Sequence, residues 1–264
     1  MKKAEQIEFV VEKLKINKKL EIDEMTGLLG VSESTVRRIF NNIEETGKAV
    51  RTHGGITLIS AAPDYSFDDL IQTKRSEKTA IGCEAAGQIE NNDIIYLDCG
   101  TTVLAMCIKL AQFLKSGKLK NIQLFTNSLA NLEILSPVTQ INLIGGRYRE
   151  NRKDFAGYMS LAVLKGLHFT KCFMGADAVD GKFSFKTTDF DTAALCQIVI
   201  NNSSKNFVLC DSSKFGKTAL VSYADLDAVN VIITDSGLDP QITGNLISAG
   251  TEIILANLDQ QGKI

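Results

Sequence analysis

The segment from Ser32 to Asn41 places hydroxyl, guanidinium and amide side chains at helical spacing. Arginine can donate two hydrogen bonds to guanine, asparagine can pair with adenine, and hydroxyls near a helix start can bond phosphate. These residue types favour a helix that reads double-stranded DNA, although a solvated helix face with two adjacent arginines would look similar. The candidate side chains are Ser32, Ser34, Thr35, Arg37, Arg38 and Asn41.

Three helices are predicted to position these side chains. A first helix over residues 3–16 carries apolar residues at helical spacing. Asp23 is expected to cap a second helix that stops at Gly30, and Ser32 is expected to cap the third. The apolar face of the third helix is formed by Val36, Ile39, Phe40 and Ile43.

A short ribbon over residues 49–58 follows the third helix and carries Arg51 and His53. His53 has no second metal ligand near it in the sequence, so it is expected at the ribbon tip or in a structural role. Helices, a tight turn and a ribbon in this order are typical of a winged helix-turn-helix, whose ribbon rests on the DNA backbone. We therefore predict a DNA-binding domain over residues 1–59, and the order of elements favours it over a plain solvated face.

The composition sets further bounds. A chain of 264 residues that is 44% hydrophobic predicts two globular domains. Acidic and basic residues nearly balance in residues 1–59, so DNA binding depends on where the charges lie. Six cysteines without a CxxC pair and two histidines predict neither a metal site nor disulfides. The absence of a signal-peptide pattern and of membrane-length apolar runs makes the cytoplasm the expected location.

Residues 60–75 are predicted to form a linker, because the stretch from Ser60 to Asp64 is rich in small residues and contains a proline. In residues 76–264, short apolar runs alternate with helical patterns, which predicts a mainly parallel α/β sheet. The predicted strands are 94–97, 122–125, 141–144, 207–210 and 229–234, and the predicted helices are 76–89, 102–114, 129–135 and 190–203.

Polar or glycine-rich loops follow these strands, at the edge where open α/β sheets bind ligands. Cations and helix N-termini suit a phosphate, whereas carboxylates and asparagine suit sugar hydroxyls. The five loops together therefore predict a site for a phosphorylated sugar, although each alone could be an ordinary turn. No GxxxxGK(S/T) or GxGxxG motif occurs, so no nucleotide cofactor is expected. The loops are residues 98–102, 126–128, 145–147, 175–177 and 211–216.

Two groups of motifs resemble those of the DeoR family of bacterial sugar-metabolism repressors. In the first domain, VSESTVRRIFNNIEETG and VRTHGG are similar to the family's VS-x-x-T-(I/V)-RRDL-x-x-LE-x-x-G and R-x-HGG. In the second, LDCGTT, TNSL, LIGGR, FMGAD, DSSKFG and ITD follow the family's order, so the resemblance spans about residues 3–255. The residues that match the first pattern are Ser32, Thr35, Arg37, Arg38, Glu44, Gly47, Arg51, His53, Gly54 and Gly55.

The resemblance implies an operator-binding head and a Rossmann-like α/β sensor domain related to ribose-5-phosphate isomerase. It implies a repressor of a carbohydrate operon, acting as a homodimer or homotetramer, whose DNA binding is modulated by a phosphorylated sugar. No cofactor and no metal are implied. The effector-binding residues that it implies are Asp98, Gly100, Thr101, Thr102, Thr126, Asn127, Ser128, Gly145, Gly146, Arg147, Asp177 and Lys214.

The chain departs from the family pattern at two places. Ile39 stands where relatives have an aspartate, so a difference in operator sequence or affinity is expected. In the late helix, Asp191 stands near the position of the family's glutamate, and the family's lysine is replaced by an apolar residue at Leu195. One side of the effector pocket is therefore expected to differ from that of relatives.

Two alternatives stay open from the sequence. The stretch from Gly175 to Gly181 resembles DGADE(I/V)D of the isomerase, which would fit a sugar-phosphate isomerase with an appended DNA-binding head. Met174 and Ala178 replace two of its carboxylates, however, and proton transfer between sugar carbons needs a base. A regulator is therefore favoured over an enzyme. An activator is as compatible with the sequence as a repressor, because the sign of regulation depends on where the operator lies.

Overall fold

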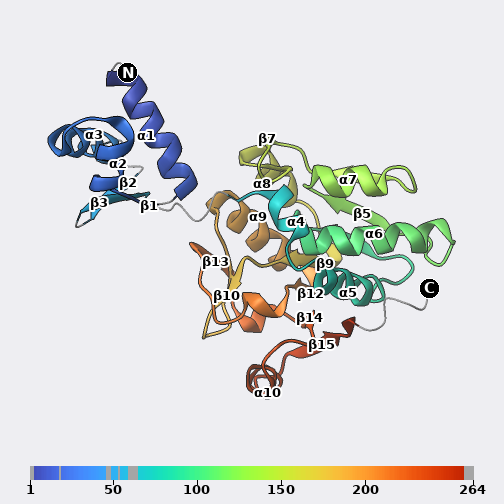
Figure 1. Ribbon diagram of the computed structural model, residues 1–264. Coiled ribbons are helices and arrows are strands. Elements are labelled where there is room, and N and C mark those ends of the chain that lie inside the picture. Colours follow the sequence, from blue (N-terminus) through green and yellow to red (C-terminus); the bar gives the residue numbers. More distant parts are fainter. Residues whose placement is uncertain (1–2, 18, 46–48, 53, 59–64, 259–264) are drawn as a thin grey trace. The chain divides into compact units, whose positions relative to one another are not determined.

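The computed structural model describes residues 3–17, 19–45, 49–52, 54–58 and 65–258 of the chain (Figure 1). The chain divides into two compact units between Asp64 and Tyr65. Within the described residues, no helix combines the length and the apolar character that a membrane span requires.

The first unit is a winged helix-turn-helix, as predicted. Its antiparallel sheet has the order β1-β3-β2, and its core is formed by residues such as Leu14, Met25 and Phe40. A Cβ on Gly55 would lie 2.3 Å from the carbonyl oxygen of Leu20, so the close approach of β1 and β3 requires glycine there. The elements are α1 (Lys3–Asn17), β1 (Lys19–Glu21), α2 (Ile22–Leu29), α3 (Glu33–Glu45), β2 (Ala49–Thr52) and β3 (Gly55–Leu58).

The start of α2 differs from the prediction that Asp23 caps it. The helix begins at Ile22, the cap position is occupied by Glu21 without a side-chain hydrogen bond, and Asp23 lies in the first turn. The reason is that Ile22 is buried and donates its N–H to the carbonyl of Gly54, which brings the chain from β1 directly into the helix. The predicted stop is confirmed, since Gly30 adopts a φ of 63° at the end of α2.

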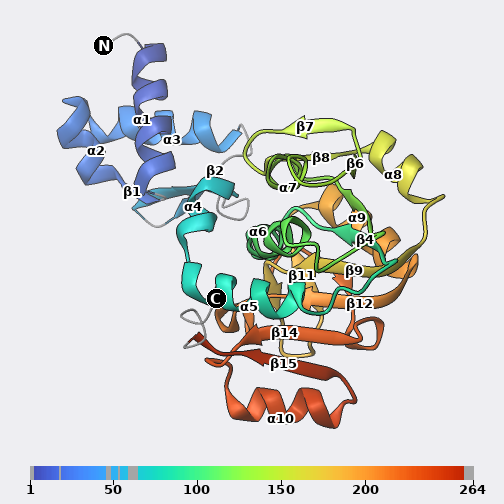
Figure 2. The same ribbon diagram turned by 90° about the vertical axis from the view of Figure 1, so that its right-hand side faces the viewer.

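The second unit is built on a seven-stranded parallel sheet with the order β15-β14-β12-β9-β4-β5-β6 (Figure 2). All five predicted strands are present within a few residues of their expected bounds. The central strand β9 and the edge strand β15 were not predicted. The strands are β4 (Ile94–Leu97), β5 (Gln123–Thr126), β6 (Ile141–Leu143), β9 (Phe169–Gly175), β12 (Ser203–Leu209), β14 (Val231–Asp235) and β15 (Glu252–Ala256).

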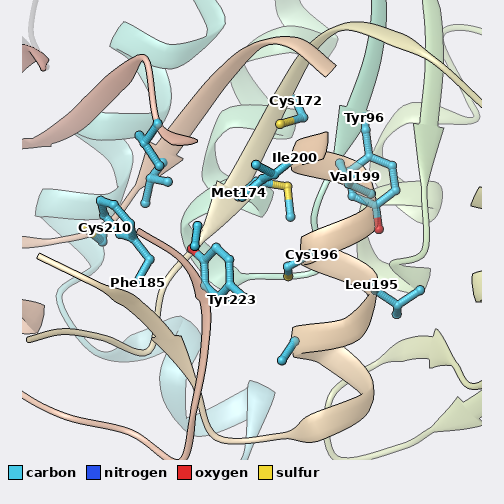
Figure 3. Close-up of a cluster of buried hydrophobic side chains, with 14 of the residues drawn as sticks. Tyr96, Cys172, Met174, Phe185, Leu195, Cys196, Val199, Ile200, Cys210 and Tyr223 are labelled. Atoms are coloured by element: carbon cyan, nitrogen blue, oxygen red, sulfur yellow. The ribbon is translucent and has the colours of Figure 1, made fainter. Parts of the chain in front are cut away.

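Helices cover both faces of this sheet. Phe173 and Phe207 project to one face and pack with residues of α5, α6 and α7. Met174 and Val208, each one residue further along its strand, project to the other face and pack with α8, α9 and α10. Figure 3 shows Met174 in this cluster with Cys196 and Ile200 of α9. The helices are α5 (Arg75–Ala86), α6 (Thr101–Lys115), α7 (Leu129–Leu135), α8 (Tyr158–Leu164), α9 (Phe190–Asn201) and α10 (Pro240–Ser248).

Smaller elements lie in the connections between the strands of the main sheet and its helices. The hairpin β7–β8 and the antiparallel sheet β10-β11-β13 were not predicted. These elements are β7 (Arg147–Arg149), β8 (Asp154–Ala156), β10 (Ala178–Val179), β11 (Phe185–Thr187), β13 (Val221–Ala224) and two short 3-10 helices, η1 (Ser212–Lys214) and η2 (Leu226–Ala228).

Residues 65–75, which were expected to belong to a linker, are part of the second unit. They contain the helix α4 (Phe67–Gln72), which is capped by the side chain of Ser66. Phe67 is only 2% exposed and packs with Leu104 and Ala130. An aromatic side chain four residues after Pro63 therefore anchors this stretch to the body. Residues 59–64 of the predicted linker lie outside the described residues.

Candidate nucleic-acid interface and ligand pocket

The helix α3 separates apolar from polar side chains as the sequence predicts. Val36, Ile39, Phe40 and Ile43 are buried in the core of the first unit. Ser34, Arg37, Arg38 and Asn41 are exposed at spacings of three and four residues, which places them on one face of the helix. This face has the donors and acceptors that base edges and phosphates require.

Ile39 is 1% exposed and lies in the core. This burial confirms that Ile39 belongs to the apolar face of the helix, and the expected difference in operator sequence or affinity stays a prediction. Ile39 contributes to the packing of the first unit, and its buried side chain cannot contact a base directly.

The hydroxyls at the start of α3 form a small cluster. Oγ of Ser32 lies 2.9 Å from Oγ of Ser34 and 3.1 Å from Oγ1 of Thr35. The carbonyl of Ser32 accepts the N–H of Val36, so Ser32 stands at the beginning of the helix as predicted. Ser32 and Ser34 are exposed and Thr35 is half-buried, which leaves this end of α3 able to contact phosphate.

The ribbon side chain Arg51 lies against α3. Its guanidinium donates hydrogen bonds to Oδ1 of Asn41 and to the carbonyl oxygen of Arg37, and its backbone N–H donates to Glu44 at 2.7 Å. Arg51 is therefore engaged with the helix that carries the candidate base-reading residues. His53, which was predicted to contact DNA, lies outside the described residues.

The second unit contains an open pocket of about 540 Å³ at the carboxyl ends of the strands. It is lined from α4, α5, the start of α6, the turn of the β7–β8 hairpin, β11, α9 and η1. Three of the five predicted loops reach it. The predicted effector residues that line it are Asp98, Gly100, Thr101, Thr102, Asp177 and Lys214.

The loop of residues 126–128 does not line this pocket. Oγ1 of Thr126 donates to the carbonyl of Leu97 at 2.7 Å, and the amide of Asn127 bonds both the hydroxyl of Tyr96 and the carbonyl of Phe155. Ser128 caps α7. All three residues are buried, and their polar atoms hold the strand ends together.

The loop of residues 145–147 also lies away from the pocket lining. A Cβ on Gly146 would lie 2.3 Å from Oγ of Ser160, so glycine is needed there for packing. Arg147 is 71% exposed at its side chain and pairs with Asp191 at 2.7 Å. For both loops the residues predicted to bind effector have a visible structural partner instead.

Two cationic residues of the pocket were not predicted, and Lys78 is the first. It is 5% exposed and donates to the carbonyl of Leu70 at 2.6 Å. Burial lowers its pKa to about 8, and the neighbouring charge of Lys214 acts in the same direction. The sequence did contain a signal, because Lys78 precedes Ile81 and Ala85 at the spacing of the apolar face of α5.

Arg152 is the second. It comes from the turn of the β7–β8 hairpin, is 6% exposed and donates to Oγ1 of Thr188. Its guanidinium lies 4.0 Å from the centroid of the Tyr65 ring, in cation–π geometry. No sequence motif marks this arginine, because the hairpin brings it to the pocket from outside the strand-end loops.

Carboxylates and a helix terminus complete the pocket. Asp98 accepts the N–H of Gly175 at 2.9 Å, and burial raises the pKa of its carboxyl. Asp177 accepts hydrogen bonds from Thr187 and from the N–H of Thr188. The cap of α6 has no side-chain acceptor, so the first N–H groups of that helix point toward the pocket without an intrahelical partner. The arrangement can bind an anion at one part and hydroxyls at another.

The late helix α9 faces the pocket through Thr192 and Cys196. Leu195, by contrast, is 2% exposed and packs in the core (Figure 3). Leu195 itself therefore does not line the pocket, and the expectation that one side of the pocket differs from that of relatives stays a prediction. Among the described residues, no group of three His, Cys, Asp or Glu side chains could hold a metal ion.

Met174 and Ala178, which replace the isomerase carboxylates, are both buried in the sheet region. Met174 belongs to the core cluster shown in Figure 3. The carboxylates that remain in the pocket, Asp98 and Asp177, are engaged by backbone N–H groups.

Two families match this chain. Residues 7–62 match the DeoR-like helix-turn-helix domain, and residues 73–236 match the DeoR C terminal sensor domain. The lactose phosphotransferase system repressor of Lactococcus lactis is 34% identical over 247 residues, which cover 91% of this chain and 94% of the relative. The HTH-type transcriptional regulator IolR of Bacillus subtilis is 30% identical over 226 residues, covering 85% of this chain and 88% of the relative.

Solved structures resemble part of the chain. Ribose 5-phosphate isomerase from Plasmodium falciparum has 18% identity and a TM-score of 0.40, with 52% of each chain covered. The eIF2B delta structure from Chaetomium thermophilum has 17% identity and a TM-score of 0.43, covering 62% of this chain and 59% of that one. These likenesses are distant and partial.

Proposed function

Because the chain belongs to the DeoR family of DNA-binding transcriptional regulators, we propose that it represses a carbohydrate operon and that a phosphorylated sugar in the described pocket modulates its DNA binding. Relatives of similar length support this role, since they include lactose phosphotransferase system repressors of two bacteria and a putative aga operon transcriptional repressor. The function is regulation and not catalysis, in keeping with the family. In the proposed DNA interface, Arg37, Arg38 and Asn41 face base edges, while Ser32, Ser34 and Thr35 face phosphate.

One observation carries the effector proposal: Lys78, Arg152 and Lys214 all line one pocket with the N-terminus of α6. A phosphate monoester carries close to two negative charges at neutral pH and has three acceptor oxygens. Buried cations without an anion are costly, and a phosphate would relieve that cost. Asp98, Asp177 and the threonine hydroxyls of the same pocket would accept and donate hydrogen bonds to sugar hydroxyls.

The pocket wall α4 offers a route for regulation. It is the first helix described after the DNA-binding unit, and Leu70 of this helix and Tyr65, two residues before it, line the pocket. An effector that bonds Lys78 or Arg152 competes with the contacts these residues make with Leu70 and Tyr65. If the effector binds the DNA-free form better, it weakens DNA binding by the same factor.

We further propose that the regulator acts as a homodimer or homotetramer, since paired heads read half-sites about one helical turn apart. The helix α8 supports this proposal because it exposes Tyr158, Met159 and Val163, which are 84%, 69% and 51% accessible. Large exposed apolar side chains on one short helix are typical of a surface that is covered by another chain.

Fluorescence anisotropy on DNA from upstream of the protein's own gene tests the proposal. A panel of sugar and polyol phosphates is added at one fixed salt concentration, with the unphosphorylated sugars as controls. We expect one phosphate ester to weaken specific binding, and Lys214→Ala to abolish that response. Lys217→Ala is the matched control, because Lys217 is exposed and only three residues away. Specific DNA binding that no phosphate ester alters would contradict the effector assignment.

A further inference from the structure

Asn41 lies on the exposed face of α3, three residues after Arg38 and four after Arg37. An asparagine side chain offers an acceptor oxygen at one corner of its amide and a donor nitrogen at the other. Which bases it can recognise therefore depends on how the amide is turned. A freely rotating amide can present either corner and discriminates poorly.

The orientation of this amide is set by Arg51. The guanidinium of Arg51 is a hydrogen-bond donor only, so the atom of Asn41 that faces it must be the oxygen. The assignment thus follows from chemistry, although oxygen and nitrogen are otherwise hard to tell apart. The amide nitrogen of Asn41 is left at the corner that points away from Arg51.

Arg51 itself is held at several points. Its backbone N–H donates to Oε1 of Glu44 at 2.7 Å, and its Nη1 also reaches the carbonyl oxygen of Arg37. Its Nε is buried and has no hydrogen-bond partner among the described residues. Nε is therefore shielded from solvent, and Nη1 is engaged by two acceptors of α3, so these two nitrogens lie against the helix.

We propose that Arg51 is a specificity-determining positioning residue, which acts on DNA recognition through Asn41 and fixes the order of donor and acceptor that Asn41 presents to a base pair. This assignment goes beyond family membership and is independent of any effector. It contrasts with the usual part of a wing arginine, which is a sequence-independent contact with the DNA backbone.

The test is selection of binding sites from a pool of randomised duplexes, followed by affinity measurements on the preferred site and its single base-pair variants. The proteins are the full-length wild type, Asn41→Ala, Arg51→Ala, Arg51→Lys and the double variant of Asn41→Ala with Arg51→Ala. Asn42→Ala is the matched control, because it removes a neighbouring amide and leaves the Arg51–Asn41 bond intact. Circular dichroism and the melting temperature check the fold of each variant.

We expect Asn41→Ala to remove a base preference of roughly 5- to 100-fold at one base pair of each half-site. Arg51→Ala should flatten the preference at that same base pair, and the double variant should lose nothing further there. Arg51→Lys keeps the charge, but its ammonium lies one bond nearer the backbone than Nη1 and lacks the planar fork of the guanidinium, so its preference should be intermediate. If Arg51→Ala does not fold, the Arg51→Lys comparison alone decides the question.

Three results would overturn the proposal. The first is that Arg51→Ala weakens binding to all sequences equally and lowers the slope of log affinity against log salt by about one, as loss of a phosphate contact would. The second is that it alters the preference at a base pair other than the one that Asn41 controls. The third is that Asn41→Ala changes no base preference.

Discussion

The ammonium of Lys78 donates a hydrogen bond to the carbonyl of Leu70 at 2.6 Å, which joins a buried cation of the pocket to the last turn of α4. Lys78 and Thr101 also line a second hollow, together with Ile71 and Gln72 of α4. Besides the lysine, the helix is held by the buried ring of Phe67 and by the ion pair between Asp68 and Lys153. A ligand that takes the hydrogen-bond donors of Lys78 removes one of these attachments.

Replacing this lysine tests its part in effector binding. Lys78→Met keeps the length of the side chain and removes its charge, so a phosphate loses a charge-assisted hydrogen bond of about 1.5–3 kcal/mol. We expect effector affinity to fall roughly 10- to 100-fold in calorimetry while operator affinity without effector is kept. Lys115→Met on α6 is the control. Equal effector affinity in the two variants would show that Lys78 does not bind the effector.

The pH dependence of effector binding should report the same residue. The pKa of Lys78 is lowered to about 8, chiefly by burial. A phosphate ester stays dianionic above its second pKa of about 6, so the charge of the effector does not change between pH 7 and 10. Effector affinity should hold below pH 8 and fall above it, by up to tenfold per unit, and Lys78→Met should lose this dependence.

The lowered pKa of Lys78 also makes the stability of the protein depend on pH. Between pH 8 and the ordinary lysine value, the unfolded chain binds a proton that the folded chain lacks. Stability rises with pH wherever the unfolded state binds more protons, so the contribution of Lys78 to the free energy of unfolding should increase over that range. Urea titrations of wild type and Lys78→Met at pH 7 and pH 9.5 would show the difference, and a parallel change in both proteins would contradict it.

Exposed arginines of α3 should contribute to operator affinity. Arg37→Ala and Arg38→Ala should each weaken specific binding, by about 1–3 kcal/mol where the side chain reads a base. Lys19→Ala serves as the control, since Lys19 is exposed on β1 and pairs with Glu21. Anisotropy titrations at one salt concentration measure the effect, and unchanged affinity in both arginine variants would rule out this face of the helix.

The anchoring of α4 can be weakened without touching a polar pocket residue. Phe67→Ala removes a side chain that is 2% exposed and should destabilise the second unit by about 3 kcal/mol. We expect faster amide hydrogen exchange in residues 67–72 and a smaller effect of effector on DNA binding. Phe190→Ala is the matched control, because Phe190 is 68% exposed. A full effector response in folded Phe67→Ala would exclude α4 from the coupling.

Substitutions of Gly145 and Gly146, which follow β6, test packing and ligand binding separately. Gly146→Ala places a Cβ 2.3 Å from Oγ of Ser160 and 2.7 Å from the carbonyl oxygen of Ala156, whereas a Cβ on Gly145 meets nothing within 4 Å. Gly146→Ala should therefore lower the melting temperature by several degrees, and Gly145→Ala should leave it and effector affinity unchanged. A loss of effector binding in a fully stable Gly145→Ala variant would show that this loop binds the effector.

Most of the sheet was predictable because its strands are continuous apolar runs. The central strand β9 was missed because it includes Lys171, whose side chain is 12% exposed and pairs with Glu90 and Asp93. A lysine with two carboxylate partners breaks the apolar pattern without leaving the strand. Such partners lie about eighty positions away in the chain, so no local window reveals them.

The pocket was predictable only where it is built from strand ends. Asp98 directly follows a predicted strand, and Lys214 lies in the loop after another, whereas Asp177 follows the unpredicted strand β9 and was found from its polar loop and the family motif. Arg152 and Lys78 come from a hairpin turn and a helix face, where the sequence gives no sign of convergence. The predicted loops around Asn127 and Gly146 are not part of the described pocket lining, because their polar atoms and glycines are used in hydrogen bonds and close packing.

Tyr65 is both a wall of the pocket and the first residue described after the boundary between the two units. In a chimeric regulator that joins this sensor to a foreign DNA-binding head, the position of the junction therefore decides whether the pocket is complete. A junction placed before Tyr65 carries the whole binding site into the chimera. A junction at Arg75, the end of the linker predicted from the sequence, would remove Tyr65 and Leu70 from the pocket wall. Such a chimera should not respond to the ligand.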